Sequence, residues 1–344
     1  MKSSATLADI VSASGLSRAT VDRVLNNRPG VHRRTRDLVA RVKQELESGT
    51  DRQPSGDGDA SVRQRSRRNF DMIMQSGETF IASLTQRVDA LKPRLDELGC
   101  NLRMTGFDVR SDAALVDAIA SADSSDGFAV IAKNSEPALD ILRALQARHK
   151  PVVAAISDVE LSARSCYVGI DNRAAGQTAG FLMGRHLGSQ AEASVAVVVG
   201  NLSYVCHEDR EIGFRTMLRQ RFPTVDVVDV LKGEDSADAT YEATRKMLAS
   251  HPDIDGIYNL SGGNEGLAQA LADSGVVARP LFITHEVNSV TERLLRTMVI
   301  DYVITQDIDQ ILISIAEQLQ LLAAHEKVVD QTLIPFHIEC KYSL

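Results

Sequence analysis

The chain has 344 residues, of which 44% are hydrophobic and 24% are charged, and its formal net charge is −8. This length and apolar content are sufficient for two or three domains with buried cores, and they exclude a disordered or fibrous protein. The charge is unevenly divided, because residues 1–68 carry 14 Lys and Arg against 8 Asp and Glu, whereas the rest of the chain carries 24 against 38. A basic segment ahead of an acidic body indicates that only the N-terminal end binds a polyanion.

The four cysteines have no CxxC spacing and lie in or beside apolar runs, which favours buried free thiols; they are Cys100, Cys166, Cys206 and Cys340. No signal-peptide pattern opens the chain, and no stretch of about 18 uninterrupted apolar residues occurs in it. We therefore expect a cytoplasmic protein that does not bind a membrane.

The first 48 residues contain three stripes of apolar residues at helical spacing: Leu7, Ile10 and Val11; Val21, Val24 and Leu25; and Leu38, Val39, Val42 and Leu46. Thr6 is suited to cap the first helix, Gly15 to end it, and Ser17 to cap the second. Two helices joined by a short turn that contains glycine are typical of a helix-turn-helix. We therefore predict a small all-α DNA-binding domain over residues 1–48.

The second predicted helix would turn its polar residues outward and Val21, Val24 and Leu25 inward; the outward residues are Arg18, Ala19, Thr20, Asp22 and Arg23. Arginine matches the hydrogen-bonding edge of guanine, and Ser17 or Thr20 can hold a phosphate at the helix N-terminus. This pattern favours a helix that reads DNA in the major groove.

Residues 49–69 are rich in Gly, Ser, Asp and Arg and have no apolar periodicity, which predicts a linker. After it, short β-branched runs alternate with amphipathic stretches such as 172–187, 207–221 and 263–274. Ten strands are predicted, at 70–74, 101–105, 127–132, 151–156, 166–170, 194–200, 225–231, 256–260, 280–284 and 301–305. This alternation predicts an α/β body over residues 70–344, built as two doubly wound lobes of parallel sheet with a ligand crevice between them.

No catalytic, metal or cofactor site is expected. The four residues at 206–209, Cys-His-Glu-Asp, are neighbours on a helix and do not converge on one ion, and GGNEG at 262–266 lacks dinucleotide-binding or P-loop spacing. No nucleophile motif or assembled acid–base set occurs, so an enzyme is disfavoured.

Residues 6–46 resemble the DNA-binding domain of the lac repressor family, through Thr6–Ile10, Gly15–Val21, Arg23–Asn26 and Val31–Arg36. The resemblance implies that Arg18, Ala19 and Arg23 read bases and that Thr6, Ser17, Thr20 and Asn26 contact phosphates. Val11 and Asp22 depart from the family pattern, which usually has Ala and Ser there.

The linker departs further, because the family's hinge helix carries a Leu that enters the minor groove, and residues 49–69 contain no Leu. We expect arginines to hold the DNA backbone or minor groove instead; these are Arg63, Arg65, Arg67 and Arg68.

Residues 70–344 resemble the ribose-type and polyol-type periplasmic binding proteins that this family uses as effector domains, through 151–158, 167–182, 210–214, 262–266, 282–286 and 304–307. The resemblance implies an effector site for a hydroxyl-rich ligand, made of Phe80, Asp158, Arg210, Asn259, Asn264, Glu286 and Gln306. Carboxylate acceptors, a forked Arg donor and one flat apolar face suit such a ligand. Asp171 and Asn172 either belong to this region or only cap the helix that follows them.

The sequence therefore predicts a regulator, expected to be a repressor, whose affinity for a pseudo-palindromic operator depends on a sugar or polyol. Because no leucine heptad follows the last predicted strand, we expect a homodimer rather than a tetramer. Two alternatives stay open: the same architecture sensing a purine or an amino-acid-like ligand, and a solute-binding protein without enzymatic activity.

Overall fold

The computed structural model describes residues 6–7, 18–26, 39, 43, 67–107, 111–122, 124–275 and 278–344. The chain divides into two compact units, residues 1–63 and 64–344. The first unit contains helix α2 (Arg18–Leu25), and the second contains all the other described helices and strands.

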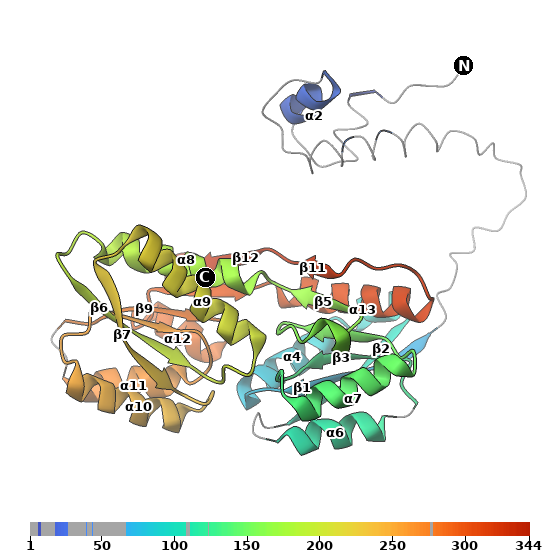
Figure 1. Cartoon of the computed structure of the whole chain (residues 1–344), viewed down its shortest axis with the longest axis horizontal. Helices are drawn as coiled ribbons and strands as arrows, with labels where there is room; N and C mark the ends of the chain where they lie inside the picture. Colours follow the sequence, from blue (N-terminus) through green and yellow to red (C-terminus); the bar gives the residue numbers. More distant parts are fainter. Residues whose placement is uncertain are drawn as a thin grey trace, which may run out of the picture. The chain divides into compact units, whose positions relative to one another are not determined.

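The second unit begins with a lobe built on a six-stranded sheet, shown on the right of Figure 1. The strand order is β11-β5-β4-β3-β1-β2, and every pairing is parallel. The strands are β1 (Arg68–Gln75), β2 (Cys100–Phe107), β3 (Gly127–Ile131), β4 (Val152–Ala155), β5 (Cys166–Gly169) and β11 (Gln331–Leu333). One face of the sheet packs against α4 (Glu78–Ala90), α5 (Lys92–Glu97) and α13 (Ile308–Ala323). The other packs against α6 (Asp112–Ser121), α7 (Glu136–Ala147) and the short helix η1 (Leu161–Ala163).

The second lobe repeats this design with the strand order β12-β10-β9-β8-β6-β7. The strands are β6 (Ala193–Val199), β7 (Val225–Lys232), β8 (Gly256–Asn259), β9 (Leu281–His285), β10 (Tyr302–Gln306) and β12 (Phe336–Glu339), of which only β12 is antiparallel to its neighbour. Helices α8 (Asn172–Leu187) and α9 (Val205–Arg221) cover one face, and α10 (Ala237–Ser250), α11 (Asn264–Ser274) and α12 (Ser289–Arg296) cover the other (Figure 1). Strands buried on both faces explain why their sequences are nearly continuous apolar runs.

The chain passes between the two lobes three times, after β5, after β10 and after β11 (Figure 1). Helix α13 therefore packs in the first lobe although it follows a strand of the second. Three connections limit the relative motion of the lobes to closure about a common hinge region.

All ten predicted strands and the two-lobed α/β class are confirmed, but β11 and β12 were missed because they are short, mostly exposed edge strands. The linker boundary needs a correction, since β1 begins at Arg68 and so includes the last two residues assigned to the linker. The expectation that Arg68 holds DNA is corrected as well, because its Nη1 donates to Gln320 Oε1 at 2.8 Å within the body. Arg67 forms an exposed ion pair with Asp96, and its contact with DNA stays a prediction. Arg63 and Arg65 lie outside the described residues.

Candidate functional site

Helix α2 covers the predicted DNA-reading segment. Val21 is fully buried, whereas Arg23 is exposed, as expected for a helix with one polar face. Leu25 was predicted to face inward but is 38% exposed, because it is the last helical residue and the helix ends there. Ser17 and the side chains of Arg18, Ala19 and Thr20 lie outside the described residues, and Thr6 is exposed.

Asp22 and Asn26 are joined across one turn of α2. Asn26 Nδ2 donates to Asp22 Oδ1 at 2.8 Å and to the Asp22 carbonyl oxygen at 3.0 Å. The carboxylate that departs from the family pattern is therefore covered by an amide rather than left bare. Contact of Asn26 with a phosphate stays a prediction, and it requires this amide to release Asp22.

A cavity of about 210 Å³ lies between the two lobes of the body. Its lining comes from the carboxyl ends of β1, β3 and β4 in the first lobe, and from α9 and the carboxyl ends of β7, β8 and β9 in the second. The carboxyl edge of parallel strands is where α/β folds place ligands, because the loops that follow the strands converge there.

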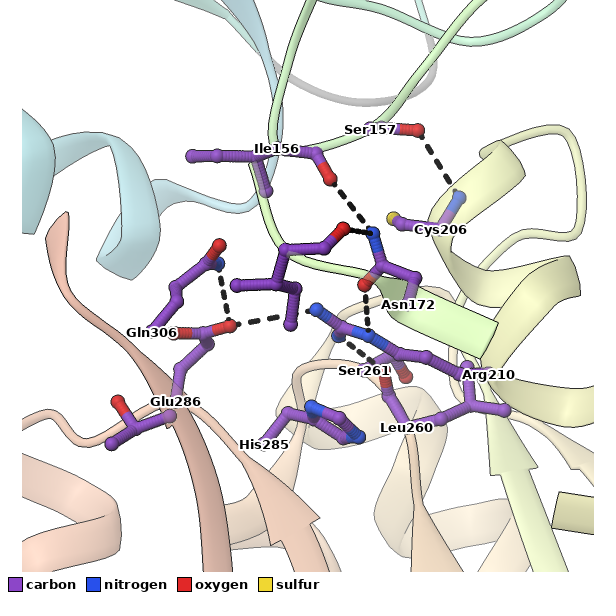
Figure 2. Close-up of polar contacts among 12 residues, drawn as sticks. Ile156, Ser157, Asn172, Cys206, Arg210, Leu260, Ser261, His285, Glu286 and Gln306 are labelled. Atoms are coloured by element: carbon purple, nitrogen blue, oxygen red, sulfur yellow. Dashed lines mark hydrogen bonds and ion pairs between the residues drawn. The ribbon is translucent and has the colours of Figure 1, made fainter. Parts of the chain in front are cut away.

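Arg210 occupies the centre of this cavity on α9 and is only 4% exposed (Figure 2). Its Nε donates to Asn172 Oδ1 at 2.8 Å, its Nη1 donates to the Leu260 carbonyl oxygen at 3.0 Å, and its Nη2 lies 3.5 Å from Glu286 Oε1. Three partners from three different elements fix the plane of the guanidinium, so the group is oriented before any ligand binds.

Asn172 is a positioning residue rather than a helix cap. The cap of α8 is Asp171, whose side chain accepts from Ala174 N. Asn172 instead donates to the Ile156 carbonyl oxygen at 3.1 Å while it accepts from Arg210 (Figure 2). The sequence alone left both roles open for these two residues, and the structure divides the roles between them.

Two residues that end strands at the cavity have left-handed backbone conformations. Ile156 follows β4 with φ 66°, and Glu286 follows β9 with φ 63°. For residues with a Cβ this conformation costs about 1–3 kcal/mol, and it persists where surrounding contacts enforce it. Here Asn172 holds the Ile156 carbonyl, and Thr291 Oγ1 donates to the Glu286 carbonyl at 2.8 Å.

Glu286 is held from behind by Gln306, whose Nε2 donates to Glu286 Oε1 at 2.8 Å (Figure 2). Burial raises the pKa of the Glu286 carboxyl, while Arg210 and Gln306 act in the opposite direction. The carboxylate is thus retained by its neighbours in a site that disfavours its charge.

Two histidines, His207 and His285, line the cavity. Burial lowers the pKa of His207, against the effect of Asp235, and burial together with Arg210 and His207 lowers the pKa of His285 further. His285 Nε2 lies 2.7 Å from the Tyr258 hydroxyl, and its Nδ1 is buried without a hydrogen-bond partner. A neutral imidazole with one unsatisfied nitrogen can donate to or accept from a ligand.

Four of the seven predicted effector residues line the cavity, namely Phe80, Arg210, Asn264 and Glu286. Gln306 and Asn259 instead support lining residues: Gln306 holds Glu286, and Asn259 Nδ2 donates to Asn264 Oδ1 at 2.9 Å. Asp158 is a correction, because it forms an ion pair with the buried Arg164 (Nε to Oδ1 2.5 Å) and is not among the lining residues that the structure describes.

Sequence reasoning missed several lining residues: Ser157, Tyr204, His207, Asp235 and His285. Three of them, Ser157, Asp235 and His285, lie within four residues of the end of a predicted strand, so their position relative to the strand ends was the available signal. Tyr204 and His207 lie at the start of α9, where nothing in the sequence distinguishes them from ordinary helix residues.

Among the residues that the structure describes, no group of His, Cys, Asp and Glu is arranged to hold a metal ion. Within the same part of the chain, no helix is both long enough and apolar enough to cross a membrane.

Comparison with known proteins agrees with this geometry. Residues 73–327 match the periplasmic binding protein domain, and residues 6–47 match the bacterial regulatory proteins of the lacI family. Both are families of binding proteins rather than enzymes. No curated protein sequence matches the chain.

Solved structures share the fold of the body at low sequence identity. A glucose–galactose binding protein from Geobacillus stearothermophilus is 21% identical with a TM-score of 0.72, over 81% of this chain and 99% of that one. An ABC transporter solute-binding protein from Burkholderia graminis, in complex with D-arabinose, is 18% identical with a TM-score of 0.73, over 80% and 96%. One from Agrobacterium vitis with bound D-fucose is 17% identical with a TM-score of 0.72, over 79% and 95%. The chain therefore belongs to the periplasmic binding protein domain family and carries, ahead of that domain, a DNA-binding domain of the lacI family of bacterial regulatory proteins.

Proposed function

We propose that the protein is a transcriptional repressor that binds a pseudo-palindromic operator as a homodimer in the cytoplasm. A small sugar, polyol or related hydroxylated ligand in the cavity between the lobes controls its affinity for that operator. The observation that carries the proposal is Arg210, a buried guanidinium that three partners hold in this cavity, in a chain that begins with a lacI-type domain.

The groups around the cavity suit a hydroxyl-rich ligand. Arg210 donates, Glu286 accepts, and Phe80 supplies an apolar surface. Asn264 offers its Nδ2 as a donor, because its Oδ1 already accepts from Asn259 and Thr284. The volume of about 210 Å³ is below the range of roughly 300–1,000 Å³ that holds drug-sized ligands, which favours a molecule as small as a monosaccharide. The solved relatives that contain D-arabinose and D-fucose support the same ligand class.

Coupling to DNA follows from the position of the cavity. A ligand that contacts both lobes stabilises their closed arrangement, and a change in that arrangement alters the spacing of the two DNA-binding domains in a dimer. Such coupling is typically worth about 1–3 kcal/mol, or a change of roughly 5-fold to 150-fold in operator affinity.

The test is a thermal-shift screen of the full chain against neutral sugars, cyclitols, sugar acids, purines and amino acids, followed by operator binding with and without each hit. A ligand at 100 times its Kd should stabilise the protein by about 2.7 kcal/mol. Release of operator DNA by the ligand supports a repressor, whereas ligand-promoted binding would overturn the repressor role. Stabilisation by a purine or an amino acid alone would replace the ligand class.

A matched pair of variants on α9 tests the site. Arg210→Ala should keep operator binding and lose the response to the ligand, and Arg219→Ala, which removes an exposed guanidinium from the same helix, should keep both. The melting temperature of each variant without ligand verifies that it folds. An unchanged ligand response in folded Arg210→Ala would remove this cavity from the proposal.

A further inference from the structure

Asp235 is a lining residue whose charge has no cationic partner within the described part of the chain. It lies in the connection between β7 and α10, at φ 54°, directly after Glu234 at φ 50°. Its Oδ1 accepts from Gly262 N at 2.8 Å, which fixes the direction of the carboxylate. Two successive left-handed residues with side chains cost conformational energy, so contacts with the surrounding structure must hold this loop in its conformation.

Glycine backbones make the space for this carboxylate. A Cβ added to Gly200 would collide with Asp235 Oδ2, and one added to Gly262 would lie 3.2 Å from Oδ1. Across the cavity, in the first lobe, a Cβ on Gly77 would lie 3.8 Å from Asp235 Cβ. The Asp235 carboxylate therefore lies against glycines of the second lobe, while the Cβ and backbone oxygen of Asp235 lie closest to Gly77 of the first lobe.

The other charges inside the cavity are already compensated. Arg210 and Glu286 form a pair, and Asn172 and a backbone carbonyl satisfy the rest of the guanidinium. Burial lowers the pKa of both His207 and His285, which disfavours the charged imidazolium, although Asp235 acts in the opposite direction on His207. This leaves Asp235 as the inner charge that no neighbouring cation balances in the described structure.

The remaining acids of the lining are at its rim. Glu78 and Glu265 are exposed, and Glu265 Oε1 pairs with Arg293 Nη2 at 2.7 Å. They add negative electrostatic potential at the entrance and do not change the balance of charges inside the cavity. A carboxylate or phosphate on a ligand would meet repulsion at both places.

The first lobe supplies a surface that suits a cation. Phe80 lines the cavity on α4, three residues after Gly77, and the face of an aromatic ring attracts a positive group. His285, which also lines the cavity, has a buried Nδ1 atom without a hydrogen-bond partner, so a polar ligand group would have a second polar neighbour there. An ammonium between Phe80 and Asp235 would have both an anion and a ring as neighbours.

We infer that Asp235 determines ligand specificity by accepting a protonated amine, so that the effector is an amino sugar or amino polyol rather than a sugar acid or sugar phosphate. This inference rests on the proposed function, because it assumes that the cavity holds a hydroxylated ligand. Asp235 contributes charge selection, while Arg210 and Glu286 orient the hydroxyl groups.

The experiment measures binding of matched monosaccharides by calorimetry with the full chain. Each series contains the neutral hexose, its 2-amino form and its acid, for glucose, galactose and mannose. At least one amino form should bind at least about tenfold more tightly than its parent, since a charge-assisted hydrogen bond is roughly twice as strong as a neutral one. The acids should bind more weakly than the neutral forms.

Asp235→Asn should reduce the preference for the amine, measured as the ratio of the Kd of the parent hexose to that of its amino form, to below about twofold. Asn tolerates the left-handed conformation and can still accept from Gly262 N, so the loop is preserved. Asp238→Asn is the matched control, because it removes the same charge from an exposed position in the first turn of α10 and should keep the preference. For the unmodified protein, the preference should also fall when the pH is raised through the pKa of the amine.

The outcomes separate the two proposals. A neutral hexose that binds as tightly as its amino form, with a ratio unchanged in Asp235→Asn, overturns this inference and leaves the sugar-responsive function in place. Tighter binding of the acid than of the neutral and amino forms also overturns this inference and leaves the sugar-responsive function in place. If no member of any series binds, this inference is overturned, and the thermal-shift screen decides the ligand class of the proposed function separately.

Discussion

Replacing Asn172 by Ala should uncouple the orientation of Arg210 from the first lobe. The substitution removes the acceptor of Arg210 Nε, at 2.8 Å, and the donor to the Ile156 carbonyl oxygen, at 3.1 Å. The Ile156 carbonyl oxygen keeps a second donor, the Tyr167 hydroxyl at 3.1 Å, so Arg210 Nε is the buried group that loses its partner. A buried polar group without a partner costs about 1–3 kcal/mol, and we expect a loss of that size in the free energy of unfolding. For a body of this size the melting temperature should fall by roughly 2–10 °C.

The neighbouring residue provides the control. Asp171 caps α8 without contacting Arg210, so Asp171→Ala should cost only about 1 kcal/mol, as for an ordinary N-cap. Ligand affinity should separate the two variants more clearly than stability. Asn172→Ala should weaken binding about tenfold or more, because the guanidinium is no longer held in place before the ligand arrives, whereas Asp171→Ala should leave affinity unchanged.

Urea unfolding and calorimetric titration with a ligand from the screen measure both quantities. The reasoning is refuted if Asn172→Ala binds ligand as tightly as the unmodified protein, or if Asp171→Ala loses as much affinity as Asn172→Ala. Either result would mean that the Asn172–Arg210 hydrogen bond does not orient the guanidinium for binding.

Three further predictions concern packing, pH and closure. Gly176→Ala should destabilise the body by about 1–3 kcal/mol, since the new Cβ would overlap the backbone carbonyl of Arg210 where α8 and α9 meet; an unchanged urea midpoint would contradict this close approach. The pKa of His285 is lowered, so below about pH 6.5 the unfolded chain binds a proton that the folded chain excludes, and the free energy of unfolding falls as the pH is lowered. His285→Gln should reduce that loss between about pH 7 and pH 5.5. An equally steep loss in the variant would refute the assignment. Tyr204→Phe removes the 2.6 Å hydrogen bond from the Tyr204 hydroxyl to the Gln75 carbonyl oxygen, which joins the two lobes. The variant should bind the ligand roughly 2-fold to 12-fold more weakly and have a larger radius of gyration in X-ray scattering. Unchanged affinity would show that this contact does not favour closure of the lobes.

Much of the fold was predictable because it depends on local patterns. Continuous β-branched runs such as 194–200 are typical of strands buried on both faces, and the helix at 172–187 begins after an Asp that caps it. The return of the chain to the first lobe through α13 was not predictable, since an apolar helix of that composition packs equally well on either sheet. Strands β11 and β12 were missed because edge strands of three or four residues carry little periodicity.

The candidate site also contains residues that were predictable from the sequence and residues that were not. Arg210 and Glu286 stand in motifs that the sequence displays, and both line the cavity. Asp158 stands in a similar motif, but tertiary packing places Arg164 beside it and uses its charge there.

The sequence by itself determined the order of the parts, a basic helical unit followed by an acidic α/β body, because charge and apolar periodicity are properties of the chain. Tertiary structure decided which polar side chains meet in the cavity, because they come from loops far apart in the sequence. Asp235 is the clearest case: only folding places its carboxylate against Gly200 and Gly262 and its backbone near Gly77 of the other lobe.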